Sequence, residues 1–143
     1  MKATVERTAL LKSLGHVHRV VEKRNTIPIL SNVLIEAGPE GSGAGIMRFM
    51  ATDLDLQIVD EAEAAIDQPG TTTVSAHTLF EIVRKLPEGS QVSLSAADNR
   101  LHVAAGRYKS NLPTISRDDF PIIAEGELPT RFDLPAATLR QII

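Results

Sequence analysis

The sequence predicts an α+β fold in which two helices lie on one side of antiparallel sheets. One spacing carries this prediction: a strand-ending aliphatic residue is followed five and nine positions later by aliphatics on one helix face. It occurs three times, at Val5, Leu10 and Leu14, at Val74, Leu79 and Val83, and at Leu134, Leu139 and Ile143. Three alternating apolar segments follow each of the first two copies. The chain therefore holds two strand–helix–strand–strand–strand units and the start of a third.

The helix of the first unit carries a cationic stripe. Its apolar face is predicted at Leu10, Leu14, Val17 and Val21. The exposed side chains recur at steps of four, three and four, as Lys12, His16, Arg19 and Lys23, with Arg24 at the end of the stripe. A solvated helix face explains such a stripe in many proteins, and a surface for an anionic partner is the sharper interpretation.

The strands of the first unit follow a break at residues 25–28. We expect strands over 32–37 and 47–52, and a third that begins at Leu54 and continues the alternation of Leu54, Leu56 and Ile58. The long glycine-rich turn at 38–45 lacks the Gly-Lys-Ser/Thr of a phosphate-binding loop. Residues 68–70 then turn the chain into the second unit.

The second unit opens with a strand over 71–74 and an amphipathic helix. Leu79, Val83 and Leu86 form its apolar face, whereas His77, Glu81 and Arg84 lie on the opposite face. Pro87 and Gly89 end the helix. Alternation predicts strands around 92–94, 101–105 and 108–112, and the Pro- and acid-rich residues from 114 to 129 are typical of a connector.

Composition indicates an ordinary globular protein with an uneven charge distribution. The chain has 143 residues, of which 43% are hydrophobic. It has no cysteine, which excludes disulfides and thiolate chemistry. Residues 1–24 contain six Lys or Arg and two Glu, so they carry +4 and the remainder carries −7. With no signal-peptide pattern and no membrane-spanning apolar run, we expect a cytoplasmic protein without a membrane partner.

No pattern in the sequence indicates a catalytic centre, a metal site or a cofactor. Asp53, Asp55 and Asp60 are more typical of a solvated strand than of a metal site, and His16 and His18 diverge on a helix. Ser75 lacks the Gly-x-Ser-x-Gly turn of a nucleophile and suits a cap. Two other classes of protein stay open. One is an α+β enzyme domain that binds a small anion. The other is a single-strand-binding module, although such modules usually stack bases on aromatic side chains and this chain has only five.

Five segments, taken in order, resemble the family of bacterial beta sliding clamps, the processivity subunits of DNA polymerase III. They are KATVER at 2–7, RNTIPILSN at 24–32, ATDLDL at 51–56, LPEG at 86–89 and DDFP at 118–121. The resemblance implies that residues 1–120 are the first clamp domain, 121–129 a connector and 130–143 the truncated start of a second clamp domain. We therefore expect a longer parent protein.

The resemblance also implies a function without catalysis. In the family, two subunits close a ring around duplex DNA, with the sheets outside and basic helices inside. The implied DNA-binding residues are Lys12, Arg19, Lys23, Arg24 and Arg84, and the implied dimer-interface residues are Ile82, Arg100, Arg107 and Lys109. The implied partners are non-specific duplex DNA, a second copy of the full-length protein, and, through domains that this chain lacks, the replicative polymerase and clamp loader.

Overall fold

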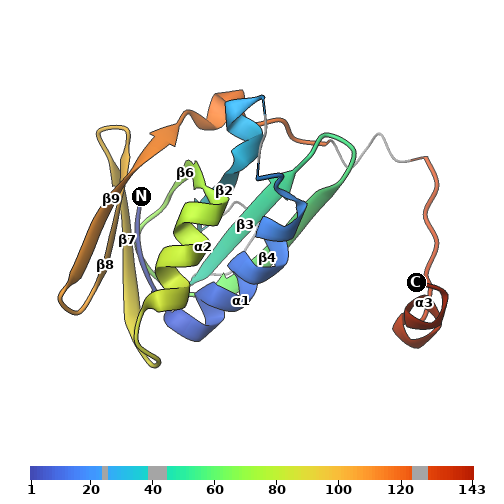
Figure 1. The fold of residues 1–143 in the computed structure, drawn as a ribbon, viewed down its shortest axis with the longest axis horizontal. Helices are drawn as coiled ribbons and strands as arrows, with labels where there is room; N and C mark the ends of the chain where they lie inside the picture. Colours follow the sequence, from blue (N-terminus) through green and yellow to red (C-terminus); the bar gives the residue numbers. More distant parts are fainter. Residues whose placement is uncertain (24–25, 39–44, 124–128) are drawn as a thin grey trace.

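The structure is a computed structural model that describes residues 1–23, 26–38, 45–123 and 129–143 (Figure 1). Two units follow one another in the same order of elements. The first comprises β1 (Lys2–Glu6), α1 (Arg7–Val17), β2 (Asn32–Ala37), β3 (Ile46–Thr52) and β4 (Gln57–Glu63). The second comprises β6 (Gly70–Ser75), α2 (Ala76–Lys85), β7 (Gln91–Ala97), β8 (Arg100–Ala105) and β9 (Tyr108–Ile115). The predicted α+β class and the repeated unit are confirmed.

The two units interlock through their sheets. The strand order is β4-β3-β2-β6-β9-β8-β7-β1-β5, and every pairing is antiparallel. The opening strand β1 pairs with β7 of the second unit, whereas β6, which opens the second unit, pairs with β2 of the first. Neither unit therefore has a complete sheet of its own.

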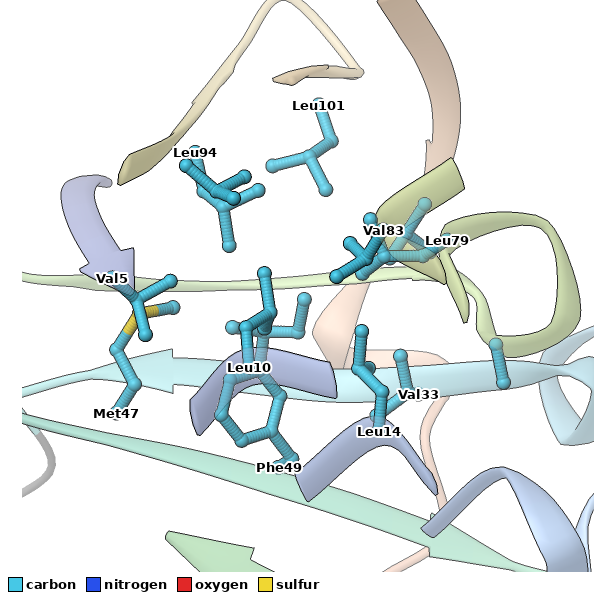
Figure 2. Close-up of a cluster of buried hydrophobic side chains, with 14 of the residues drawn as sticks. Val5, Leu10, Leu14, Val33, Met47, Phe49, Leu79, Val83, Leu94 and Leu101 are labelled. Carbon is cyan, nitrogen blue, oxygen red and sulfur yellow. The ribbon is translucent and has the colours of Figure 1, made fainter. Parts of the chain in front are cut away.

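One hydrophobic core fills the space between the sheets and the helices (Figure 2). Leu10 and Leu14 of α1 meet Leu79 and Val83 of α2 in this cluster, and all four are fully buried. Strands of both units complete it with Met47, Phe49, Leu94 and Leu101. Because each unit contributes side chains to the same cluster, we expect the units to fold together.

A smaller cluster lies on the other side of the sheet. Leu34 and Met50 of β2 and β3 pack there with Phe120, which follows the short 3₁₀ helix η3 (Arg117–Asp119). Leu30, from the 3₁₀ helix η2 (Pro28–Ser31), joins them. The Pro- and acid-rich segment expected to be a connector from residue 114 is therefore folded up to Phe120.

The structure corrects the predicted end of the first helix. The α-helix stops at Val17 and continues only as the 3₁₀ helix η1 (His18–Val20), whereas helical spacing predicted one continuous helix to Val21. The burial predicted for Val21 is confirmed. The backbone N–H of His18 and its Nδ1 both bond to the carbonyl of Leu14, which caps the helix there. Arg19 therefore lies on the 3₁₀ helix and Lys23 lies beyond it.

Two strand predictions were also inaccurate. The strand expected from Leu54 begins at Gln57, because Asp53 Oδ1 accepts the backbone N–H groups of Asp55 at 3.0 Å and Leu56 at 2.7 Å and forms a turn. Leu54 and Leu56 are consequently exposed. The short strand β5 (Ala65–Gln68), which pairs with β1, was not predicted.

The third copy of the spacing forms the helix α3 (Ala136–Ile142). Leu134, Leu139 and Ile143 are nevertheless exposed, as are all described residues from 129 to 143. The helix prediction is confirmed, but this segment has no core of its own in the described structure. Nowhere in the described chain is a helix long and apolar enough to span a membrane.

Candidate nucleic-acid interface

The two helices α1 and α2 lie side by side and antiparallel on one side of the sheets (Figure 1). At one end, Arg7 at the start of α1 donates hydrogen bonds to the carbonyl oxygens of Val83 at 3.2 Å and Arg84 at 2.8 Å. At the other end, His77 Nε2 lies 2.9 Å from the carbonyl oxygen of Val21. The helices therefore form one layer whose outer face both units share.

Local sequence explains where each helix begins. Glu6 caps α1 by accepting the backbone N–H of Ala9 at 3.0 Å, and hydrogen bonds from the backbone of Thr8 and Ala9 lower the pKa of its carboxyl. Ser75 caps α2 by accepting the N–H of Thr78. The cap expected of Ser75 is confirmed.

Three cations of the predicted stripe are exposed. Lys12 lies on α1, Arg19 on η1 and Lys23 just beyond. None of the three forms an ion pair with another described residue. They are therefore available to an anionic partner. Arg24, the fourth cation expected here, lies outside the described residues.

Arg84 brings a cation from the second unit to the same layer. It lies in the last turn of α2 and is exposed, but its guanidinium contacts the carboxylate of Glu81 at 2.7 Å. That hydrogen bond is the main reason why the pKa of Glu81 is lowered. Arg84 is thus a cation with a counter-ion, in contrast to Lys12 and Arg19.

His16, which the spacing placed in the stripe, is paired with the sheet. Its Nδ1 lies 2.6 Å from a carboxylate oxygen of Asp60 on β4. Partial burial opposes ionisation of Asp60, but hydrogen bonds from His16 and from the backbone of Glu61 outweigh it and lower the pKa of the carboxyl. This pair joins α1 to β4.

A second surface lies at the edge of the second unit. An apolar groove of about 480 Å³ is lined by Ile82 of α2, by Leu86 directly after this helix and by Tyr108 of β9, with His77, Thr78, Glu81 and Lys85 around them. The first residues of β9 pair only with β8, because β6 meets β9 at Thr114 and Ile115 alone. The groove therefore lies beside an unpaired strand edge.

The structure places only some of the predicted interface residues at this groove. Ile82 lines it, and Arg107 and Lys109 are exposed on either side of Tyr108 in the chain. Arg100 is elsewhere, since it pairs with Pro113 at the opposite end of the β8–β9 hairpin and lines a different, polar groove. At about 3.3 Å per residue, Arg100 is more than 10 Å from Lys109 along the hairpin.

Sequence reasoning missed Tyr108, Leu86 and Lys85 as groove residues. A tyrosine between two cations at a strand start is a weak signal without the tertiary contact to α2. The pairing of Glu81 with Arg84 was detectable, because opposite charges three residues apart on a helix are neighbours. The metal alternative gains no support, since the described residues hold no group of three ligating side chains.

Two interlocked strand–helix–three-strand units, with both helices on one face of antiparallel sheets, define a domain of the DNA-clamp class. The family model for the DNA polymerase III beta subunit, N-terminal domain, matches residues 1–124. The chain therefore belongs to the family of bacterial DNA polymerase III beta subunits.

Relatives and solved structures agree with this assignment. The chain is 52% identical over 145 residues to the beta sliding clamp of Caulobacter vibrioides (strain NA1000 / CB15N) and 37% identical over 146 residues to that of Escherichia coli K12. Both matches cover the whole chain, which spans 38% of each relative.

Among solved structures, the sliding clamp of Bartonella birtlesii bound to griselimycin superposes with a TM-score of 0.88 at 42% identity, covering 98% of this chain and 36% of that one. The clamp of Caulobacter crescentus gives a TM-score of 0.82 at 53% identity, covering 89% and 34% of the two chains. The clamp fold that the sequence predicted is confirmed.

Proposed function

We propose that this chain is the first domain of a processivity clamp, a non-catalytic subunit of a bacterial replicative DNA polymerase. Two copies of the longer protein would close a ring that encircles duplex DNA, slides without sequence preference and tethers the polymerase. The observation that carries the proposal is the layer that α1 and α2 form together, since each of these helices bears an exposed cation, Lys12 or Arg84. Family membership supports the same activity.

The proposed contacts are with phosphates. Lys12, Arg19, Lys23, Arg24 and Arg84 are long cations, and no Asn or Gln is paired with them for reading base edges. Contacts of this kind are independent of sequence and weaken with salt. The chain by itself, with no closed ring to trap DNA, should bind duplex DNA more weakly than about 10 μM at physiological salt.

The proposed dimer surface is the apolar groove with the unpaired edge of β9. Ile82 and Tyr108 provide the apolar centre, and Arg107 and Lys109 provide the cationic rim. We keep Arg100 as a proposed contact at the far end of the hairpin. Because like charges would meet across a two-fold axis, the partner surface should be an acidic edge in another domain of the second subunit.

The proposed organisation follows from the same assignment. Residues 1–120 form the first clamp domain, 121–129 the connector and 130–143 the start of the second domain. The polymerase and the clamp loader would bind to domains beyond this chain, in the cytoplasm.

The test uses the longer protein with paired substitutions on the two surfaces. Arg24→Ala with Arg84→Ala should impair loading and retention on circular DNA while the dimer persists in sedimentation. The matched variant, Arg107→Ala with Lys109→Ala, removes the same charge and should weaken the dimer. Wild-type retention by the first variant would contradict the assignment of the helical face.

A further inference from the structure

We propose that the carboxylate of Glu81 competes with DNA phosphate for the guanidinium of Arg84. The second unit then contributes less to DNA binding than its positive charge suggests. The inference rests on the proposed function of the helical face. It concerns one acidic residue to which neither the family resemblance nor the sequence pattern gave a role.

The geometry places Glu81 where it can occupy Arg84. The two residues are one turn apart on α2, and their side chains meet at 2.7 Å. Both side chains are about half exposed, at 46% and 56%, so solvent and a phosphate oxygen can reach the pair. A guanidinium whose donors already face a carboxylate must exchange that partner before it can bind a phosphate with the same atoms.

Three basic side chains act on the carboxylate of Glu81. Arg84, Lys85 and His18 each contribute attraction that favours its ionised form, in that order, after the hydrogen bond from Arg84. His18 is held nearby because its ring stacks on Phe80 with centroids 4.0 Å apart. The carboxylate of Glu81 therefore has basic side chains near it, and it also lines the apolar groove.

The ion pair is not needed to hold the end of α2. Arg7 already bonds to the carbonyl oxygens of Val83 and Arg84. The buried Leu79 and Val83 anchor the helix from below. Exposed pairs of this spacing add little to stability. A substitution at Glu81 should therefore alter binding without altering the fold.

A clamp that slides has a physical use for such competition. A phosphate contact made through the Arg84 Nη2 that now faces Glu81 replaces a carboxylate contact, so the net free energy of that exchange is small. The carboxylate also repels a phosphate that approaches. In the first unit Lys12 and Arg19 form no ion pair with a described residue, so the two units should contribute unequally.

The experiment is a double-mutant cycle on the 143-residue chain. Fluorescence anisotropy with a labelled duplex at low salt gives the Kd of wild type, E81Q, R84A and the E81Q/R84A pair, and circular dichroism checks each fold. E88Q is the matched control, because Glu88 is exposed just beyond the helix and forms no ion pair with a described residue. It changes the net charge equally.

We expect E81Q to tighten binding about threefold relative to E88Q, and this gain to disappear when Arg84 is alanine. If R84A weakens binding but E81Q and E88Q have equal Kd values, the competition is absent. It is also absent if the gain in affinity persists without Arg84. In both cases the assignment of the helical face to DNA binding is unaffected. If neither R84A nor Lys12→Ala with Arg19→Ala weakens binding, the proposed DNA face itself fails. E81A, which cannot accept a hydrogen bond from Arg84, must show at least the gain of E81Q, whose amide oxygen can still accept one.

Discussion

The two strand–helix–three-strand units have the same order of elements but carry different charges on their exposed surfaces. In the first unit Lys12 and Arg19 are unpaired among the described residues, and its outer strand β4 carries three carboxylates and no cation. In the second unit Arg84 is paired with Glu81, and the free edge of β9 begins between Arg107 and Lys109.

The comparison shows which positions a repeat must keep. Val5, Leu10 and Leu14 are buried, as are their counterparts Val74, Leu79 and Val83, because both sets supply one core. Exposed positions are free of this constraint and can differ between units.

The largest expected effect tests whether the two units are one folding unit. Leu14→Ala in α1 and Leu79→Ala in α2 should each lower the free energy of unfolding by about 2–5 kcal/mol, because both side chains are fully buried in the shared core. Urea denaturation should show one transition for each variant. Leu56→Ala, at an exposed position, should cost less than about 0.5 kcal/mol. Separate transitions for the two units would contradict the interlocked fold.

A smaller effect tests the direct link between the helices. Arg7→Ala removes two hydrogen bonds from α1 to the end of α2 and should lower the free energy of unfolding by about 1–2 kcal/mol. Arg7→Lys keeps the charge but not the forked donor, so it should restore only part of this loss. Lys2→Ala, which breaks an exposed pair with Asp67, is the control and should change stability by less than about 0.5 kcal/mol. Equal losses of stability for Arg7→Ala and Lys2→Ala would contradict a stabilising role for the hydrogen bonds from Arg7 to the end of α2.

Much of the fold was accessible from spacing, because burial imposes a period on apolar residues. Leu79, Val83 and Leu86 predicted α2 correctly, and all three are buried. The alternation at Leu54 and Leu56 predicted a strand that is not there. These residues lie in a turn that Asp53 closes with its side chain. Strand β5 has no clear alternation, and its pairing with β1 depends on the tertiary fold.

The candidate surfaces were less accessible than the fold. Helical spacing predicted that Lys12 and Arg19 lie away from the apolar face of the first helix. Both are exposed, even though α1 ends earlier than predicted. The pairing of His16 with Asp60 joins residues 44 positions apart, and no local pattern indicates it. Tyr108 and Ile82 similarly line one groove only in the folded domain.

The smallest expected effect concerns the pair of His16 on α1 and Asp60 on β4. The pKa of Asp60 is lowered in the folded state, so its contribution to stability is complete above its ordinary value of 3.8 and is lost as pH falls through the lowered value. Asp60→Asn should cost about 0.5 kcal/mol at pH 7 and flatten the acid limb of the stability profile. Thermal unfolding between pH 7 and pH 2 measures both. An unchanged acid limb would contradict the assigned role of the pair.

The central claim is that the helical face, rather than the basic strand edge, binds duplex DNA through phosphates. The most direct measurement is the salt dependence of duplex binding by two variants that each remove two positive charges: Lys12→Ala with Arg19→Ala, and Arg107→Ala with Lys109→Ala. The slope of log K against log salt should fall by about 1.8 for the helical pair, at about 0.9 per phosphate contact, and change little for the edge pair. Equal slopes for the two variants, or a larger fall for the edge pair, would contradict the account.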